Sequence, residues 1–341
     1  GGFGPGLSLS YDSGSGNGPY GLGWSSGLAS VSRKTSRGVP TYIDSEDVFI
    51  LSGGEDLIAI GSSAEVTEGA VTYQVQRYRP RTERAFARIE RWVPDAGGAV
   101  HWRTYSPDDV CSVFGRTSQA RIVNPARPEQ VFQWMLEEQW DGRGSTISYV
   151  YKAEDLVGVS GADPSEAHRV GAGGVGPGGF RYLKRVLWGN ATAVSTGETP
   201  LVEVSNPDWR FEAVLDYGEH TSDASAEVAN WAVRPDPFSS YRSGFEIRTY
   251  RLVERVLMFH RFSELGGSAE TEGALVRSTV MTYGRSDEAD QADPVASKLL
   301  RVEPIGYRGA ASEAAPPIDF EYSTVAWDEQ IRVLNRRSIE G

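Results

Sequence analysis

The chain has 341 residues and a formal net charge of −12, with 34 basic and 46 acidic side chains and no basic stripe, which argues against nucleic-acid binding. No run of about 18 apolar residues is present, so the sequence predicts no membrane-spanning helix and no direct membrane insertion. Cys111 is the only cysteine, which excludes an intrachain disulfide, and 39 glycines with 18 prolines favour short strands over long helices.

The chain begins at Gly1, inside a glycine-rich motif and without a methionine or a signal peptide. We therefore expect the natural N-terminus to lie upstream, and a single domain over residues 1–341. Leu7, Leu9 and Tyr11 alternate on one face and predict a strand, which a turn cluster over Asp12–Pro19 follows. Further short strands are predicted at Ala29–Arg33, Asp47–Leu51, Asp56–Ile60 and Val71–Tyr78.

Two hairpins follow. Phe86–Val93 and Ala99–Tyr105 flank a turn that contains Gly97 and Gly98. The second hairpin joins Val131–Trp140 to Ser145–Tyr151 through Asp141-Gly-Arg-Gly144, and an Asp-Gly turn between two aromatic-rich runs is a strong hairpin signal.

Residues Asp155 to Gly179 predict a long flexible loop. Its glycine run, Gly171–Gly179, carries too little side-chain surface to form a packed core.

A degenerate pattern recurs after Phe180: a strand containing Arg-Val, a loop, and a strand ending in Tyr. The three predicted pairs are Leu183–Trp188 with Phe211–Tyr217, Val253–Met258 with Leu275–Tyr283, and Leu299–Val302 with Ile318–Tyr322. We therefore predict an all-β fold, a large meander of β-hairpins, in which any helix is short and lies near Glu227–Val233.

One predicted strand is unusually long. Phe245–Phe259 contains neither Gly nor Pro, and Ile247, Thr249 and Tyr250 favour strand over helix. Its charged residues are Glu246, Arg248, Arg251, Glu254 and Arg255. We expect these charges to face water on one side of a broad sheet. Because no proline blocks the strand, we also expect it to offer an open edge to another chain.

Several stretches of the sequence carry a family resemblance, beginning with Gly2-Phe-Gly-Pro-Gly-Leu-Ser-Leu-Ser-Tyr11 and continuing to Trp24. The others are Ser32–Pro40, Leu51–Asp56, Ala120–Pro125, Asp236–Leu252, Arg255–His260 and Pro316–Tyr322. In this order they resemble the N-terminal domain of the SpvB/TcaC family, to which the B components of insecticidal toxin complexes (TcB-like) belong. Where the family pattern has two histidines, this sequence has His260 and Arg261.

The resemblance implies a secreted, non-catalytic part of a bacterial toxin complex. Such a part would belong to a hollow β-sheet shell of RHS type that encloses a toxic polypeptide. The implied partners are a C-type RHS component and an A-type pore-forming component. A β-propeller would be expected after Gly341. The alternative is the N-terminal targeting module of an SpvB-like mono-ADP-ribosyltransferase. A third, weaker alternative is a carbohydrate-binding module, since the chain has 9 Trp; packing in strands is the simpler account of Trp92, Trp134 and Trp188.

Two short motifs match catalytic or cofactor signatures without the required context. Gly23-Trp-Ser25-Ser-Gly27 fits the nucleophile elbow, which needs a helix after the serine, but Leu28–Arg33 predicts a strand. Gly171-x-Gly-x-x-Gly176 fits a dinucleotide fingerprint, but no strand precedes it and no helix follows. We therefore expect neither Ser25 catalysis nor a bound dinucleotide.

The remaining candidates are also better explained without chemistry. Glu270 and Glu272 have the Glu-x-Glu spacing of some ADP-ribosyltransferases but lie in an acidic turn. Asp12 and Asn17 could offer oxygen atoms to calcium, yet no complete calcium loop is present. Cys111 lies in an apolar run and is expected to be buried. The four histidines, His101, His168, His220 and His260, have no zinc spacing. We predict no catalytic, cofactor-binding or metal-binding residue, and no cofactor.

Overall fold

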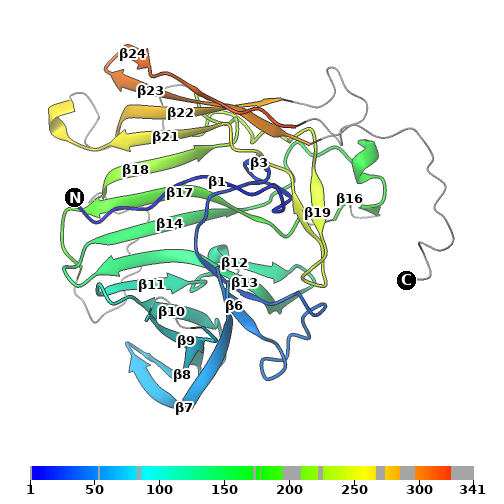
Figure 1. Ribbon diagram of the computed structural model, residues 1–341, viewed down its shortest axis with the longest axis vertical. Coiled ribbons are helices and arrows are strands. Elements are labelled where there is room, and N and C mark those ends of the chain that lie inside the picture. Colours follow the sequence, from blue (N-terminus) through cyan, green and yellow to red (C-terminus); the bar gives the residue numbers. More distant parts are fainter. Residues whose placement is uncertain are drawn as a thin grey trace, which may run out of the picture.

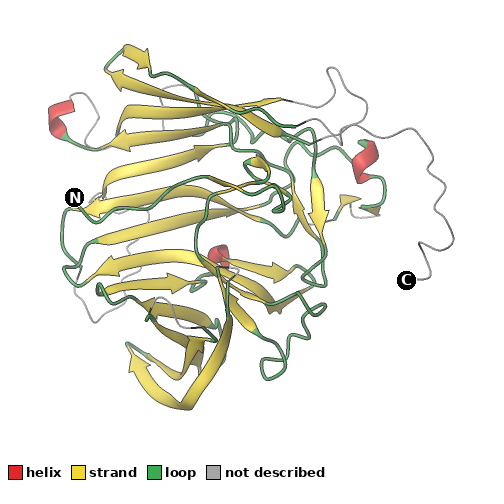
Figure 2. Cartoon of the chain, in the orientation of Figure 1, coloured by secondary structure: helices red, strands yellow, loops and turns green. Residues whose placement is uncertain are grey.

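The computed structural model describes residues 2–52, 54–82, 86–171, 174–176, 178–194, 209–221, 226–265, 273–284 and 296–323. Within these ranges the chain is built almost entirely of strands (Figures 1 and 2). The helical elements of these ranges are three short 3-10 turns, η1 (Ser118–Ala120), η2 (Pro164–Glu166) and η3 (Ser263–Leu265). The predicted all-β class is therefore confirmed.

The strands in the first part of the chain are β1 (Ser10–Tyr11), β2 (Asn17–Gly18), β3 (Gly21–Leu22), β4 (Trp24–Ser25), β5 (Ser30–Arg33), β6 (Phe49–Leu51), β7 (Asp56–Glu68), β8 (Val71–Pro80), β9 (Arg88–Pro94), β10 (His101–Tyr105), β11 (Val110–Phe114), β12 (Arg121–Asn124) and β13 (Arg127–Asp141). The later strands are β14 (Thr146–Ala153), β15 (Val170–Gly171), β16 (Gly174–Val175), β17 (Arg181–Asn190), β18 (Trp209–Asp216), β19 (Phe238–Ser240), β20 (Ile247–Thr249), β21 (Arg255–His260), β22 (Ala274–Gly284), β23 (Lys298–Arg308), β24 (Ala311–Ala314) and β25 (Ile318–Asp319).

The strands form one dominant antiparallel sheet. From β13 it continues through β14, β17, β18, β21, β22 and β23 and ends on the short strands β24 and β25 (Figure 1). The sequence-predicted pairs β9–β10, β13–β14, β17–β18, β21–β22 and β23–β25 are all present. This part of the fold is the expected meander of hairpins.

At its other end the sheet closes on itself. Here each strand from β5 to β11 pairs with the next, and β11 pairs with β13. The ring closes because Trp134 of β13 pairs with Val31 of β5. β13 belongs both to the ring and to the row of hairpins. Its C-terminal half pairs with β11 and β14, and its N-terminal half pairs with β12 and β5. The row of hairpins therefore has no second open end at β5.

Aromatic rings fill the closed part of the sheet. Phe49 lies edge-on to Trp102 and Trp134, with ring centroids 5.0 and 5.8 Å away. Gly115 has φ +64°, and a Cβ there would lie 2.4 Å from Cδ1 of Trp134, so only glycine fits. Of the tryptophans expected to pack, Trp92 and Trp134 are buried, and Trp188 is half-buried and stacks on Phe211 with ring centroids 5.5 Å apart. Their position confirms packing, rather than an exposed sugar-binding surface, as the role of these tryptophans.

The long strand predicted over Phe245–Phe259 is wrong. The chain forms β20, leaves the strand conformation over 250–254, and forms β21, which lies inside the sheet between β18 and β22. The interruption allows Arg251, whose side chain is 1% exposed, to reach the carboxylate of Glu154. The charges of this segment therefore do not face water along one strand, and the segment offers no open edge.

Two further expectations fail in the described residues. No helix is present over Glu227–Val233, which has an extended, irregular course between the sheet and β19. The long loop predicted over 155–179 contains η2, and the side chains of Glu166 and Arg169, which precede its glycine run, are 1% and 3% exposed. The predicted strand over Leu7–Tyr11 is reduced to β1, which pairs with β4.

Among the described residues, none of the helical elements has the length and apolar character needed to cross a membrane.

Candidate functional site

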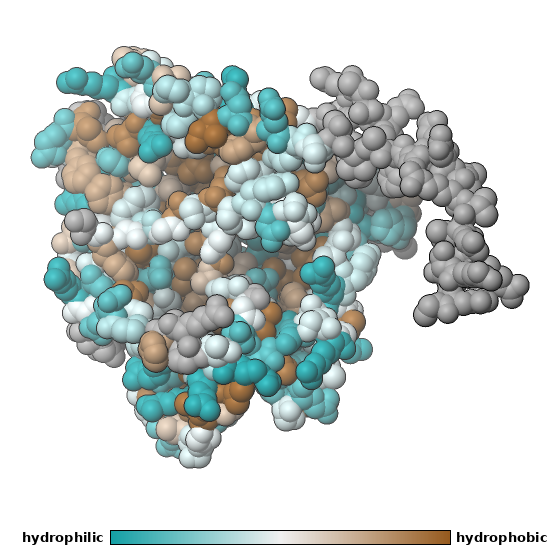
Figure 3. All heavy atoms as spheres, in the orientation of Figure 1, coloured by the Kyte–Doolittle hydropathy of each residue, from teal (hydrophilic) through white to brown (hydrophobic). Residues whose placement is uncertain are grey.

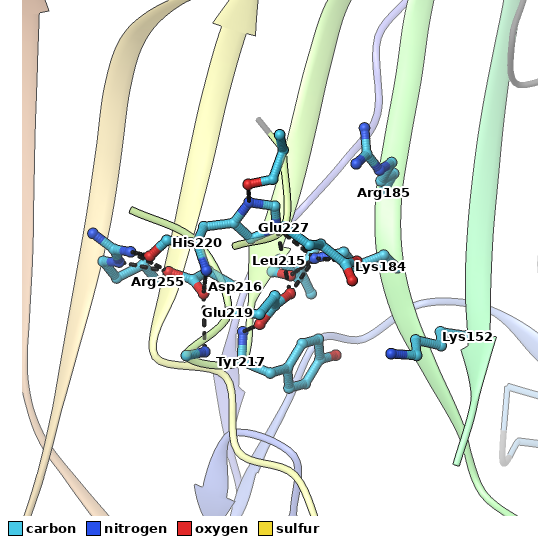
Figure 4. A network of polar contacts seen from close by, with 12 residues as sticks. Lys152, Lys184, Arg185, Leu215, Asp216, Tyr217, Glu219, His220, Glu227 and Arg255 are labelled. Carbon is cyan, nitrogen blue, oxygen red and sulfur yellow. Dashed lines mark hydrogen bonds and ion pairs between the residues drawn. The ribbon is translucent and has the colours of Figure 1, made fainter. Parts of the chain in front are cut away.

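A buried polar cluster lies where β18 ends and the chain turns over the sheet. Its centre is Lys184 of β17, and its other members, Asp216, Glu219, His220 and Glu227, come from the end of β18 and the turn after it (Figure 4). The side chains of Lys184 and Glu219 are 6% and 0% exposed. Buried ionisable groups gathered in this way are the first place to look for chemistry.

The ammonium of Lys184 has a complete set of acceptors. It donates to the carboxylate of Glu219 and to the main-chain oxygen of Leu215 at 3.3 Å, and its Nζ lies 2.6 Å from Nε2 of His220. Nδ1 of His220 lies 3.0 Å from the main-chain oxygen of Ala226. Because a carbonyl oxygen only accepts, the network assigns the imidazole proton to Nδ1 and leaves Nε2 to accept from the lysine.

Carboxylates also hold the turn itself. Asp216 accepts from the amides of Gly218 at 2.9 Å and His220 at 3.2 Å, and from Nε of Arg255 at 2.6 Å. Glu219 accepts from the amide of Tyr217 at 2.7 Å. The turn after β18 is thus tied to β17 and β21 by side chains that reach under it.

The electrostatics of the pair follow from burial and contact. Burial opposes ionisation of Glu219, but hydrogen bonds to its carboxylate and the charge of Lys184 outweigh burial and lower the pKa of Glu219 to about 2. Burial also lowers the pKa of Lys184, against the hydrogen bond and charge of Glu219. The carboxylate contact therefore favours the charged form of the Lys184 side chain, and burial opposes it.

Glu219, His220 and Glu227 have the donor types and spacing of a metal site, since one ligand atom of each lies within 4.8 Å of the others. The Lys184 ammonium, however, contacts Glu219 and His220 and lies 3.5 Å from the Glu227 carboxylate. A protonated amine at this point repels a metal cation and takes the lone pairs that would bind it. The arrangement is better suited to anchoring the turn than to holding a metal.

A second ionic cluster fixes the segment between β14 and β17. Glu166 accepts from Arg248 at 2.5 Å, from Arg169 at 2.9 Å and from the Tyr250 hydroxyl at 2.6 Å. Burial opposes ionisation of Glu166, but these contacts lower its pKa to about 2. The cluster holds η2 against β20.

The residues singled out from the sequence are scattered over the fold. Ser25 lies in β4, where the hydroxyl of Ser10 is 3.3 Å from its own, so no strand-turn-helix elbow surrounds it. Asp12 accepts from the amide of Gly14 at 2.8 Å, while the oxygen of Asn17 accepts from Arg234. These contacts close turns and join loops.

Cys111 is buried as expected, and burial raises the pKa of its thiol to about 12. Burial and the charge of Arg103 lower the pKa of His101 to about 2, and burial lowers the pKa of His260. His168 is exposed. Glu270 and Glu272 lie outside the described residues, as does part of the Gly171–Gly179 run.

In the sequence, His220 stands out only as one of four histidines, and no pattern predicts a role for Lys184 or Glu219. The available signal was Asp216-Tyr-Gly-Glu-His220, two carboxylates around a glycine directly after a predicted strand. Carboxylates at such a turn accept main-chain amides. The lysine that completes the cluster lies 35 residues before Glu219 in the sequence, and no local pattern marks it.

Comparisons with known proteins give consistent matches. The family model described as Salmonella virulence plasmid 65kDa B protein matches residues 1–262. The chain is 36% identical over 338 residues to the mono(ADP-ribosyl)transferase SpvB of Salmonella typhimurium, covering 92% of this chain and 53% of that protein. The chain thus spans about half the length of the curated relatives it matches.

Solved structures match over nearly the whole chain. The N-terminal domain of the effector protein SpvB from Salmonella typhimurium superposes with a TM-score of 0.77 at 35% identity, over 90% of this chain and 95% of that one. The crystal structure of TcdB2-TccC3-Cdc42 gives a TM-score of 0.81 at 34% identity, over 94% of this chain and 15% of that one. The Photorhabdus luminescens Tc holotoxin pore gives 0.79 at 34% identity, over 93% of this chain and 15% of that one.

Replacing Lys184 with methionine should destabilise the chain by about 3–5 kcal/mol, because Glu219 would remain buried without its cation. Urea unfolding measures this change. The double variant Lys184→Met with Glu219→Gln should recover part of the loss. Lys152→Met is the matched control: its ammonium is 33% exposed and contacts Asp155 at 3.1 Å, so it should cost about 1 kcal/mol or less. Equal costs for the two lysines would contradict the anchoring role.

Stability should also depend on pH through Glu219. Its pKa is lowered from 4.5 to about 2 in the folded chain, so its stabilising contribution is complete above about pH 4.5 and lost as the pH falls toward 2. Urea midpoints measured from pH 7 to pH 2 should therefore converge for the wild type and Glu219→Gln. A difference that stays constant over this range would show that the carboxylate charge is not responsible.

Proposed function

The chain belongs to the SpvB family, that of the Salmonella virulence plasmid 65kDa B protein, and from this membership we propose that it is a non-catalytic structural part of a secreted bacterial toxin assembly. In this proposal the sheet is a wall segment of a hollow β-sheet shell that encloses a toxic polypeptide. Its partners would be a C-type RHS component and, through the assembled shell, an A-type pore-forming component.

The observation that carries the proposal is the match of almost the whole chain to TcdB2 in its complex with TccC3. The internal geometry is compatible with a wall. The sheet from β13 to β23 is continuous (Figure 1), and it ends on β24 and β25, which are short and exposed. A neighbouring strand could extend the sheet at that end, since an edge strand has main-chain groups free to pair.

The buried polar groups support a structural role as well. In the two clusters described above, each cation contacts a carboxylate, and the Lys184 ammonium has no lone pair with which to attack a substrate. Catalysis by lysine needs a deprotonated amine near a reacting atom. Here the charges hold turns against the sheet.

The alternative function is the N-terminal module of a mono-ADP-ribosyltransferase toxin. The observation in its favour is the 36% identity to SpvB, together with the match to the N-terminal domain of that effector. In this case the chain would deliver or position a separate catalytic domain, and it would need no C-type partner.

Co-expression separates the two proposals. The protein containing this chain should be produced with and without a C-type RHS partner such as TccC3, and examined by size-exclusion chromatography and limited proteolysis. A wall segment should form one monodisperse, protease-resistant particle with the partner and a more protease-sensitive species without it. A monomer with the same elution volume and digestion pattern in both cases would favour the transferase module.

A second prediction concerns catalysis. Ser25→Ala should leave the toxicity of the assembled protein unchanged, because no histidine or other base contacts Ser25 among the described residues. Glu270→Gln combined with Glu272→Gln should also leave it unchanged, because the sequence predicts that both glutamates lie in an acidic turn. Esterase turnover and NAD-dependent labelling of actin are the measurements. Loss of either activity in the corresponding variant would refute the non-catalytic proposal.

A further inference from the structure

The β7–β8 hairpin projects from the closed end of the sheet, at the lower end of the molecule in Figure 1. β6 pairs with β7 only at Asp56 and Leu57. From Ile58 to Glu68, β8 is the only strand of the described residues that pairs with β7. One edge of β7 is therefore open over about ten residues.

The ladder shows which main-chain groups point out of this edge. The hairpin closes with a two-residue turn, Gly69-Ala70, between Glu68 and Val71, and Gly69 has φ +59°. The residues that flank such a turn form a hydrogen-bonded pair, and hydrogen-bonded pairs alternate with non-bonded ones along an antiparallel ladder. Glu65 and Thr67 are in the non-bonded pairs, so their N–H and C=O groups face away from β8.

Two of the usual protections of an open edge, proline and lysine, are missing from β7. Its charged residues near the turn are Glu65 and Glu68, and its pairing with β8 is irregular only at the register shift between Ile60 and Ala64. The side chains of Ile58, Ile60 and Val66 are 36–38% exposed. In Figure 3 hydrophobic side chains appear at the surface at this end of the molecule.

A hollow of about 710 Å³ lies over one face of β7, β8, β9 and β10, with β7 as its border toward the open edge. Its apolar wall includes Ile60, Val66 and Trp92, and Arg77 and Arg88 also line it. These two arginines, 63% and 49% exposed, share one carboxylate, that of Glu90, at 3.8 and 3.3 Å. Two guanidinium groups on one carboxylate leave an excess of positive charge on this side of β7.

We propose that the edge of β7 binds an extended segment of another polypeptide as an added antiparallel strand. Main-chain groups of Glu65 and Thr67 would pair with it, as in β-strand addition. Every second side chain of the added strand would face the hollow. Its apolar wall and surplus of guanidinium groups fit alternating apolar and acidic residues there. The edge of β7 lies far from β24 and β25, so binding at this edge does not depend on the proposed shell.

A second copy of this chain is disfavoured as the occupant. Pairing β7 with β7 would bring the same arginine-lined hollow of each copy together, and like charges across an interface oppose association. An acidic strand of a different segment meets the excess positive charge instead.

The test uses the peptide Val-Thr-Glu-Thr-Val-Thr-Glu-Thr, in which Val and Glu would face the hollow and the Thr amides would face β7. Binding is measured by isothermal titration calorimetry or NMR at 50 mM and 300 mM salt. One control replaces Glu with Lys, and a second is N-methylated at each Thr, which removes the strand-forming donors without changing the charge. Both controls should bind at least about tenfold more weakly, since each loses several hydrogen bonds or the charge attraction.

On the protein, Glu65→Pro removes one outward N–H, and proline is tolerated at an edge position. It should weaken peptide binding about tenfold, from the lost hydrogen bond and the blocking ring, while thermal unfolding stays close to wild type. Glu65→Thr keeps the N–H and should bind at least as well as wild type, which separates the main chain from the charge.

Equal binding of the N-methylated and parent peptides, or no effect of Glu65→Pro in a folded chain, would overturn the proposal, as would no binding at all. Concentration-dependent self-association that Glu65→Pro abolishes would identify a second copy as the occupant and overturn the acidic-strand assignment. An unchanged response to a C-type RHS partner alongside any of these results would leave the proposed function standing, so the two can fail separately.

Discussion

Three ion pairs lie buried between the sheet and its covering loops, and each supplies the opposite charge that a buried charge needs, because an unpaired charge taken out of water costs several kcal/mol. Lys184 contacts Glu219, Arg248 contacts Glu166, and Arg251 contacts Glu154. Each pair joins residues far apart in the sequence, and each fixes a loop with little apolar surface of its own. The pairing sets where the loops lie, and the loops in turn bury the aromatic residues beneath them.

The fold of the segment 250–254 shows this dependence directly. Continuing β20 into β21 as one strand would leave the guanidinium of Arg251 without its partner. By leaving the strand conformation, the chain brings Arg251 to Glu154 and also to the main-chain oxygen of Trp231 at 2.8 Å. Trp231 then stacks on Tyr217, with ring centroids 4.3 Å apart and planes 9° apart. One ion pair thus decides the course of two loops and an aromatic stack.

Local patterns were sufficient for the hairpins and insufficient for the loops. Alternation and an Asp-Gly turn identify Val131–Trp140 and Ser145–Tyr151, because both signals act over a few residues. Phe245–Phe259 has the composition of a strand throughout, yet the partner that interrupts it, Glu154, is about a hundred residues away. The closing contact between β5 and β13 is equally distant.

The candidate site also depends on contacts between distant residues, so no local pattern in the sequence predicts it. Lys184 occurs in a predicted strand, where a lysine normally faces solvent. Only the turn brought over it, with Glu219 and His220, makes it a buried cation. In the segment 155–179, Glu166 and Arg169 precede the glycine run and anchor this part of the loop through buried ion pairs.

These buried ion pairs also help to explain how the same fold can occur in different proteins. A buried carboxylate that already accepts two or three hydrogen bonds has little capacity left for a partner, whereas a strand edge offers main-chain groups whatever its side chains are. The fold recurs in the N-terminal domain of SpvB and in TcdB2 bound to TccC3, at 35% and 34% identity to this chain. Because the ion pairs and aromatic core hold the sheet from inside, the sequences of exposed edges such as β7, β24 and β25 can change without loss of the fold. Differences in what a member of this family binds are therefore expected first at its strand edges, where side chains can change while the sheet stays intact.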